Sequence, residues 1–362
     1  MVVVQQASRL GQGLTVRGRW VWLALLMAFT LPTPYAADKI QEKVVVYNWS
    51  NYIPEGVLED FTRETGIEVE YTTYDNNEIM YTRLKLLRGR GYDVVVPSTS
   101  LVAKMRDEGL LHPLDHALLP NLAALDPELL NKPYDVGNQY SVPYVWGSTG
   151  IGLNTAKIDP ATVTKWTDLW QKKWRGQLLM ADDMHEAFNI ALRINGHKIN
   201  SIDPDEIKQA YELLKKLSPN LKTISVEQSA AFLSGEVDIG IIWNGEAITA
   251  QAENPAIRYI YPAEGANFWI DSFAIPAHAI HVENAHTFIN YMLREDVAVR
   301  CVQELGYATP HLAAKKSLDE STRNNPAIFP PLEIMASADF YQQAGDASEL
   351  YQLYWEKLKA GD

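Results

Sequence analysis

Residues 44–108 have the sequence VVVYNWSNYIPEGVLEDFTRETGIEVEYTTYDNNEIMYTRLKLLRGRGYDVVVPSTSLVAKMRDE, and this stretch decides the fold. Short strand-like runs alternate with segments whose apolar residues recur at helical spacing. The pattern predicts three strands, at Val44–Tyr47, Val69–Thr72 and Val94–Val96, and three helices, at Val57–Glu64, Glu78–Leu87 and Leu101–Glu108. This βαβα order is typical of an α/β protein with a parallel or mixed sheet flanked by helices.

The alternation breaks between Leu111 and Gln139 and then resumes to the end of the chain. Further strands are expected at Leu178–Met180, Val237–Trp243 and Phe268–Ile275, and further helices at Met184–Ile194, Asp205–Leu217, Ala285–Leu293, Asp296–Leu305 and Ser348–Leu358. Trp166, Trp170 and Trp174 are spaced as one packed face of a helix. No Gly/Ser-rich or Pro-rich linker divides the chain, so we expect two lobes joined by several short crossings.

The composition excludes several classes of function. The 362 residues are 47% hydrophobic and 21% charged, which is ordinary for a folded protein. The net charge of -13 leaves few cations to neutralise phosphates, so nucleic acid is an unsuitable partner and a cationic one is favoured. Because Cys301 is the single cysteine, an internal disulfide and a multi-cysteine zinc site are excluded. It falls in a helical pattern and is expected to be a small buried hydrophobe.

The N-terminus has the pattern of a secretory signal peptide. Residues 1–19 hold three arginines and no acid, an apolar run follows from Trp20 to Leu31, and the small residues Ala36 and Ala37 come next. The run is nearer a dozen residues than the ~20 that a membrane span needs. We therefore expect cleavage near Ala36 and export to a bacterial periplasm, with a mature protein that is not embedded in the membrane. Removal of the three arginines changes the net charge from -13 to -16.

Templates for catalysis are missing from the sequence. It contains no glycine-rich phosphate loop and no G-x-S-x-G elbow. His185 and Glu186 are adjacent and so point from different faces of a helix. We expect no enzymatic activity, no cofactor and no metal.

Aromatic rings stand beside acids at the ends of the expected strands. Trp269 and Asp271 share one face of an extended segment, because side chains alternate along a strand. Trp49 follows the first strand, and Trp243 closes another just before Glu246. Ligands of open α/β sheets bind beyond the carboxyl ends of the strands, so these groups are expected to line one cleft.

Acids separated by rings suit a chain that carries more than one amine. A buried ammonium needs a carboxylate partner, and a ring face adds about 2 kcal/mol for a desolvated cation while packing the methylenes. Structural roles remain open for the same residues. Asp183 with Glu186 has the spacing of a helix capping box, Glu246 is a favourable first-turn charge, and Trp49 or Trp243 alone is more typical of a core than of a ligand site.

Seven short motifs together resemble the periplasmic spermidine/putrescine-binding proteins of bacterial ABC importers. They are Val46–Trp49, Val95–Thr99, Asn131–Pro133, Val142–Gly147, Ile242–Gly245, Phe268–Ser272 and Leu305–Pro310. The resemblance extends in order from about Val44 to Gly361. It implies a two-lobed fold with three crossings, a polyamine in the cleft, delivery to an inner-membrane ABC permease, and a monomer. After a signal peptide at 1–36, the lobes would comprise 37–147 with 271–316, and 148–270 with 317–362.

The resemblance also implies roles for individual residues. Rings that pack on methylenes or face amines are Trp49, Tyr52, Trp243, Trp269 and Tyr307; acids that hold ammonium groups are Asp183, Glu186 and Asp271; and hydroxyl or backbone contacts come from Ser50, Ser98 and Thr99. Ser100 and Glu246 resemble the putrescine type at positions where the spermidine type has Tyr and a small residue. Tyr341 replaces a ligand-contacting Gln of the spermidine type, so the sequence leaves the preferred polyamine open.

Two other functions remain as alternatives. A binding protein of the same architecture for ferric iron or a small anion would need clustered Tyr and His ligands, or cations at the strand ends. Tyr52 and Tyr307 could imitate the first arrangement. An exported enzyme acting on amines is the other alternative, and the sequence supplies no nucleophile for it.

Overall fold

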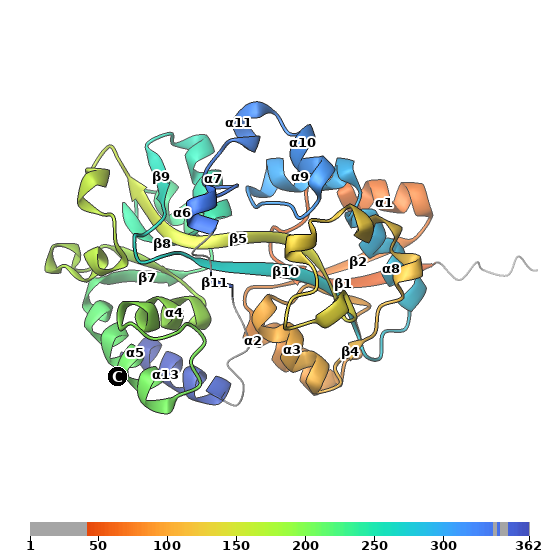
Figure 1. Cartoon of the computed structure of the whole chain (residues 1–362), viewed down its shortest axis with the longest axis horizontal. Helices are drawn as coiled ribbons and strands as arrows, with labels where there is room; N and C mark the ends of the chain where they lie inside the picture. The colour runs from red at the N-terminus through yellow and green to blue at the C-terminus, as the bar shows by residue number, and fades with distance from the viewer. Residues whose placement is uncertain (1–41, 336–338, 341–346, 362) are drawn as a thin grey trace, which may run out of the picture. The chain divides into compact units, whose positions relative to one another are not determined.

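The computed structural model describes residues 42–335, 339–340 and 347–361. The expected signal peptide and Tyr341 lie outside these residues. Within them, eleven strands form one mixed sheet (Figure 1). The strands are β1 Lys43–Trp49, β2 Glu68–Tyr74, β3 Val94–Val95, β4 Leu111–His112, β5 Ser141–Asn154, β6 Leu178–Ala181, β7 Leu221–Ser225, β8 Ile239–Trp243, β9 Ile257–Ile260, β10 Asn267–Pro276 and β11 Asp339–Phe340.

The helices follow the sequence pattern closely. They are α1 Val57–Thr65, α2 Asn77–Leu87, α3 Thr99–Asp107, α4 Met184–Ile194, α5 Pro204–Leu217, α6 Gln228–Leu233, α7 Asn244–Glu253, α8 Val282–Met292, α9 Glu295–Leu305, α10 Leu312–Ser317, α11 Glu320–Arg323, α12 Leu332–Met335 and α13 Ser348–Ala360. Local chemistry sets their ends: Asn76 caps the start of α2 by accepting from the backbone N–H of Ile79, and Gly66 ends α1 in the left-handed conformation. In the described part of the chain, no helix combines the length and apolar character that a bilayer crossing requires.

The sheet has two parallel sections joined by antiparallel strands. Its main order is β2-β1-β3-β10-β5-β8-β6-β7. In the first section β1 runs parallel to β2 and β3, and in the second β6 runs parallel to β7 and β8. The long strands β5 and β10 pair antiparallel between these sections, where Figure 1 shows them side by side. All six parallel strands are therefore arranged so that their carboxyl ends can meet at the junction.

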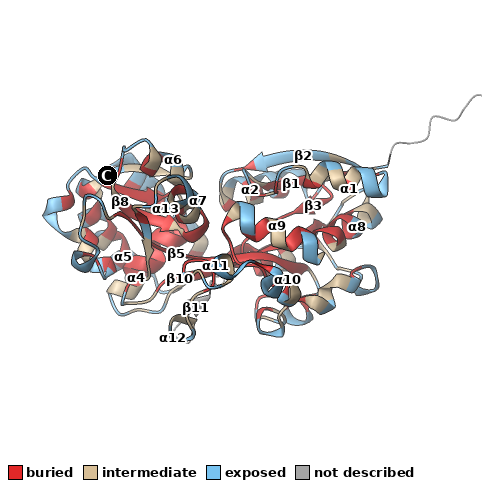
Figure 2. Ribbon diagram, turned by 90° about the horizontal axis from the view of Figure 1, so that it is seen from above, coloured by how far each residue is buried: buried red, intermediate tan, exposed pale blue. Residues whose placement is uncertain are grey.

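Separate hydrophobic cores pack against the two sections. The core around Phe61, Phe273 and Phe288 gathers side chains of β1, β3, α1, α8 and α9. We call these five elements, together with β2, α2 and α3, the β1 half. The core around Trp166 and Phe188 gathers side chains of β6, β8, α4, α5 and α13. We call these five elements, together with β7, α6 and α7, the β6 half. Figure 2 shows buried strand and helix surfaces in both. Strand β5 contributes apolar side chains to each core, so it ties the halves together.

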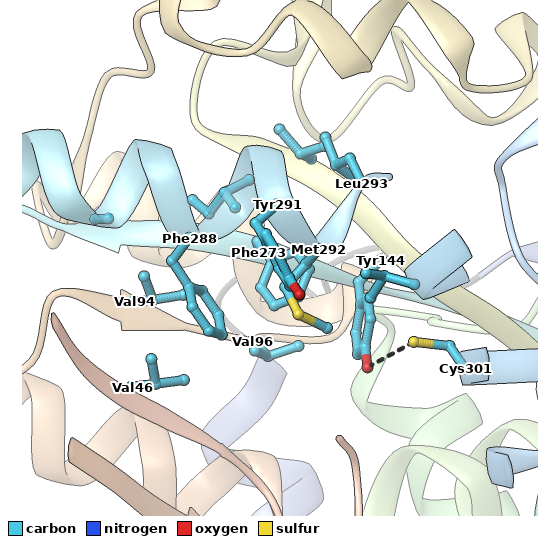
Figure 3. Packing of buried hydrophobic residues seen from close by; sticks show 14 of the residues in the cluster. Val46, Val94, Val96, Tyr144, Phe273, Phe288, Tyr291, Met292, Leu293 and Cys301 are labelled. Carbon is cyan, nitrogen blue, oxygen red and sulfur yellow. Dashed lines mark hydrogen bonds between the residues drawn. The ribbon is translucent and has the colours of Figure 1, made fainter. Parts of the chain in front are cut away.

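Cys301 is buried in the core of the β1 half, as its sequence context indicates. Its Sγ lies 3.4 Å from the hydroxyl oxygen of Tyr144, a contact drawn in Figure 3 among the surrounding apolar side chains. Burial raises the pKa of the Cys301 thiol to about 12. The group therefore stays protonated and behaves as a packing residue.

The sequence analysis was wrong about one element and missed several others, among them strands β4, β5, β7, β9 and β11 and helices α6, α10, α11 and α12. Trp166–Trp170 and Lys172–Trp174 are two short 3-10 helices, because Gln171 between them is extended, so the three tryptophans do not share one α-helical face. The 14-residue strand β5 was not predicted, since it contains a proline and three glycines. Those glycines are needed for packing: a Cβ at Gly152 would lie 2.8 Å from Phe232 and Ile242 side-chain carbons.

Candidate functional site

A cavity of about 470 Å³ lies where the parallel strands of both halves end. Residues that follow or close β1, β2, β3, β6, β7 and β8 all contribute to its wall. The wall is formed by Trp49, Ser50, Asn51, Tyr52, Tyr74, Asp75, Ser98, Asp183, Glu186, Val226, Glu227, Ser229, Ala230, Trp243, Glu246, Thr249, Trp269, Asp271, Glu304, Leu305 and Tyr307. Its size is within the range of about 300–1,000 Å³ that is usual for small-molecule sites.

Asp271 sits at a bulge of β10 and is the most constrained acid of the cavity. The register against β5 shifts between Asp271 and Ser272. Its two carboxylate oxygens accept hydrogen bonds from the hydroxyl of Tyr52 at 2.6 Å and from that of Ser98 at 2.5 Å. Burial raises the pKa of Asp271 to about 7, and the two hydroxyl donors limit that rise. The group is therefore a buried acid without a fixed cationic partner among the described residues.

Aromatic rings surround this acid. The rings of Trp269 and Tyr307 meet edge to face with centroids 5.1 Å apart, and Tyr52 lies 5.5 Å from Tyr307. Two glycines leave the space that these rings occupy. A Cβ at Gly147 would lie 2.6 Å from the Trp269 indole, and one at Gly245 would lie 2.4 Å from the Tyr307 ring. These two glycines are therefore needed because a larger residue would collide with the rings, not because the backbone adopts an unusual conformation there.

Asp183 and Glu186 mark the start of α4 on the opposite wall. Asp183 caps the helix by accepting from the backbone N–H of Glu186 at 3.0 Å, which confirms the capping role that its spacing indicates. Burial raises the pKa of Asp183. The Glu186 carboxylate instead accepts from the side-chain amide of Asn267 at 2.8 Å, on β10. Both acids also line the cavity, so capping leaves them available to it.

Glu246, near the start of α7, has a structural contact as well. One carboxylate oxygen accepts from the backbone N–H of Ser229 at 2.8 Å, and Ser229 lies in the first turn of α6. The same carboxylate helps to raise the pKa of Tyr307, after burial, which is the main cause. Glu246 therefore supports α6 and places negative charge at the Tyr307 side of the cavity.

The rings at the end of the β1 half are held from behind. The indole N–H of Trp49 donates to the carbonyl of Val96 at 2.9 Å, and the Tyr74 hydroxyl donates to the same carbonyl at 2.6 Å. Their ring centroids are 4.8 Å apart. At the rim, the Ser50 hydroxyl donates to Asp75 at 2.9 Å. These contacts fix the rings before any ligand arrives.

The structure brings eleven of the fourteen expected residues to this one cavity. They are Trp49, Ser50, Tyr52, Ser98, Asp183, Glu186, Trp243, Glu246, Trp269, Asp271 and Tyr307. Thr99 and Ser100 are buried in the first turn of α3 and are not part of the wall, because the helix turns them away from the end of β3 that Ser98 occupies. Tyr341 lies outside the described residues.

Several wall residues were not anticipated from the sequence. Tyr74 and Asp75 close β2, and Glu227 follows β7, so the strand-end rule that identified Trp49 could have found them. Glu304 had no such signal, since it lies near the end of α9. Its carboxylate accepts from the backbone N–H of Glu55 at 2.8 Å and lies 3.7 Å from Arg300.

The chemistry of the wall favours cations. It holds seven carboxyl side chains and six aromatic rings, and no Lys, Arg or His occurs among its described residues. An anion would face repulsion with nothing to neutralise it. Nor do the described residues contain a group of three or more His, Cys, Asp or Glu side chains placed to hold a metal ion. The arrangement can take up a cation with apolar segments.

Known proteins resemble this chain over most of its length. The family model of bacterial extracellular solute-binding proteins matches residues 56–330. The spermidine/putrescine-binding periplasmic protein of Escherichia coli is 46% identical over 316 residues, covering 87% of this chain and 91% of that protein. Among solved structures, a putative spermidine/putrescine ABC transporter protein from Listeria monocytogenes is 31% identical, with a TM-score of 0.84 over 88% of this chain and 99% of that one. A substrate-binding protein of a spermidine/putrescine ABC transporter from Streptococcus pneumoniae is 36% identical, with a TM-score of 0.75 over the same shares.

Proposed function

The chain belongs to the bacterial extracellular solute-binding protein family, and on that premise we propose that it captures a polyamine, spermidine or putrescine, in the cavity between its two halves. The observation that carries this proposal is the wall itself: seven carboxyl groups and six rings, with no basic side chain among its described residues. The relatives named above as spermidine/putrescine-binding support the same ligand class.

Within this proposal, the acids hold amines and the rings hold the carbons between them. Asp271 takes one ammonium group, and Asp183 with Glu186 takes another on the opposite wall. Trp49, Trp243 and Trp269 then cover the methylenes, where a ring face contributes both packing and attraction to cations. Tyr52, Tyr307, Ser50 and Ser98 complete the contacts, and Glu246 is available for a further amine.

The two halves act as lobes that close on the ligand. We divide them as 37–147 with 271–316, and 148–270 with 317–362. Support comes from the cores, since one contains side chains from 44–145 and 273–307, with Trp269 crossing the boundary at 271, and the other contains side chains from 151–241 and 347–358. Closure of such lobes is a hinge motion whose free energy comes from ligand contacts made on both sides.

Family membership also supports a proposal for where the protein acts. We propose that the protein is exported to the periplasm by its N-terminal signal peptide, acts there as a monomer and passes the polyamine to an inner-membrane ABC permease. Its negative charge raises the rate of encounter with cations, although screening over about 8 Å limits that effect to short range.

Calorimetry of the mature protein against putrescine, cadaverine, spermidine and spermine tests the proposal. A suitable control solute is 4-aminobutyrate, which carries one amine and one carboxylate. We expect saturable binding of at least one polyamine and none of the control, because no described wall residue can neutralise the control's carboxylate. Absence of binding to all four amines would refute the proposed function.

A further inference from the structure

A polar contact joins the two halves beside the cavity. Glu78 lies in the first turn of α2, in the β1 half, and His185 lies in the first turn of α4, in the β6 half. The Nε2 atom of His185 is 3.7 Å from a carboxylate oxygen of Glu78. The His185 side chain is 7% exposed and that of Glu78 is 33% exposed, so the imidazole is buried and the carboxylate is half-buried. Neither residue belongs to the cavity wall.

Asp183 connects this contact to the cavity. It precedes His185 by two residues, lines the cavity and acts on both neighbours: its charge raises the pKa of Glu78 and of His185. Glu78 and Asp183 are therefore like charges brought together from opposite halves. Because α2 belongs to the β1 half and α4 to the β6 half, the contact spans the two halves and separating them would break it.

Other charged groups face the cluster from the surrounding elements. Asp182, at the end of β6, adds negative charge near Glu78 and Asp183 and is paired with Lys359 of α13 at 3.4 Å. Lys359 in turn favours the ionised form of Glu78. Lys104 of α3 disfavours a charged His185. Tyr351 of α13 packs near the imidazole, with ring centroids 6.1 Å apart.

Burial and repulsion shift the pKa of each group in the cluster. Burial, with a smaller contribution from Asp183, raises the pKa of Glu78 to about 7. Burial also raises the pKa of Asp183 and lowers that of His185. With His185 neutral, full ionisation of both carboxyls puts two negative charges between the halves. One added proton removes half of that charge and allows a hydrogen bond across the contact.

We propose that Glu78, Asp183 and His185 form a proton-dependent latch between the β1 half and the β6 half, and that an ammonium group held by Asp183 takes the place of the proton. The approach of the halves keeps protons on the two carboxyls, so Glu78 and Asp183 bind more protons in the closed arrangement than in the open one, whereas His185, whose pKa burial lowers, binds fewer and opposes this dependence. Closure without ligand is therefore favoured as pH falls and lost as pH rises through about 7. The replacement of the proton by an ammonium group rests on the proposed function, whereas the proton-dependent latch itself does not.

Distance measurements between spin labels test the latch. Cysteines introduced at Leu86, on α2, and at Ile202, before α5, carry the labels, because both sites are exposed while Cys301 is buried. In the ligand-free protein we expect the ratio of closed to open molecules to fall between pH 6 and pH 8, by at most about tenfold per pH unit for one proton. Glu78→Gln removes the titrating carboxyl and should flatten this dependence. His185→Asn removes the opposing titration of the imidazole and should steepen it, and Glu59→Gln, an exposed glutamate of α1, should leave it unchanged.

The outcomes separate the latch from the proposed function. No dependence on pH in the wild-type protein, or the same dependence in Glu78→Gln, overturns the latch. Spermidine at pH 8 should close the wild-type protein and abolish its dependence on pH. If spermidine binds by calorimetry and the dependence persists, the replacement of the proton is wrong and the latch stands. If spermidine does not bind, the proposed function and the replacement of the proton both fail, and the ligand-free measurement still decides whether the latch exists.

Discussion

Replacing Asp271 by asparagine removes charge from the centre of the cavity while keeping the shape of the side chain. Asp271 is 4% exposed, so an ammonium group beside it would be shielded from water. Loss of a buried charge partner costs about 2–5 kcal/mol of binding, which is roughly a 30-fold to 4,000-fold rise in Kd at about 1.4 kcal/mol per tenfold. At pH 7 about half of the wild-type carboxyl is protonated, given its pKa of about 7, so the lower part of this range applies there.

The structure predicts an opposite effect of Asp271→Asn on stability. A carboxyl whose pKa is raised by folding makes the folded state bind an extra proton, so its contribution to stability is present at low pH and lost as pH rises through about 7. The variant has no charge to bury. Its thermal midpoint without ligand should therefore exceed that of the wild type at pH 8, and the difference should shrink as pH falls and vanish only below the ordinary carboxyl pKa of about 4.

Calorimetry with spermidine at pH 7 and pH 8 provides the assay, and Asp75→Asn is the matched control. Asp75 lines the same cavity but is exposed and bonded to the Ser50 hydroxyl, so its charge is screened and its replacement should cost less than about 1 kcal/mol. The reasoning is refuted if Asp271→Asn, correctly folded, loses less than about 1 kcal/mol of binding at pH 8, or if Asp75→Asn loses as much.

Four further predictions concern the same cavity. The affinity for spermidine at the Asp271 subsite should rise by up to about tenfold from pH 6 to pH 8, and binding at pH 6 should release close to one proton, because ligand and proton compete for this carboxylate. Calorimetry of Glu78→Gln in buffers of different ionisation enthalpy measures the proton release. The absence of proton release would contradict the prediction. Glu246→Gln retains an acceptor for the Ser229 N–H, and we expect it to lower the affinity for spermidine by about tenfold because a charged contact is lost. An unchanged Kd would show that Glu246 only supports α6. Gly147→Ala forces a Cβ to within 2.6 Å of Trp269 and should lower the free energy of unfolding by about 1–3 kcal/mol in urea titrations; an unchanged midpoint would mean that the ring is not fixed as described. Tryptophan fluorescence should change on addition of spermidine or putrescine, since Trp49, Trp243 and Trp269 line the cavity, and a flat titration with both would be inconsistent with the site.

Much of the fold could be predicted because its signals are local. Helix α4 begins and ends at the expected Met184 and Ile194, since Asp183 caps it and its apolar residues keep helical spacing. Strand β5 could not be predicted, because its glycines and proline are explained only by the rings and backbone packed against them from distant segments. The tryptophans at 166, 170 and 174 misled for a related reason: their spacing fits a helix, but the backbone turns between them.

The site was accessible from the sequence to the extent that it follows strand ends. Trp49, Trp243, Trp269 and Asp271 were found by position and residue type, and the structure places all four in the lining of one cavity. Glu304 was not found, because its arrival at the cavity depends on the packing of α9 against the β1 half rather than on any local pattern. The partners of Asp271 could not be read from spacing either, since Tyr52 and Ser98 are 219 and 173 residues away in the chain.

A crystal structure of the mature protein grown with spermidine tests the central claim most directly. We expect the triamine within the cavity, with one nitrogen in hydrogen-bond distance of the Asp271 carboxylate, another in reach of Asp183 or Glu186, and the carbons between them against Trp243 and Trp269. Spermidine bound elsewhere, or bound in the cavity with its nitrogens turned away from these acids, would contradict the account.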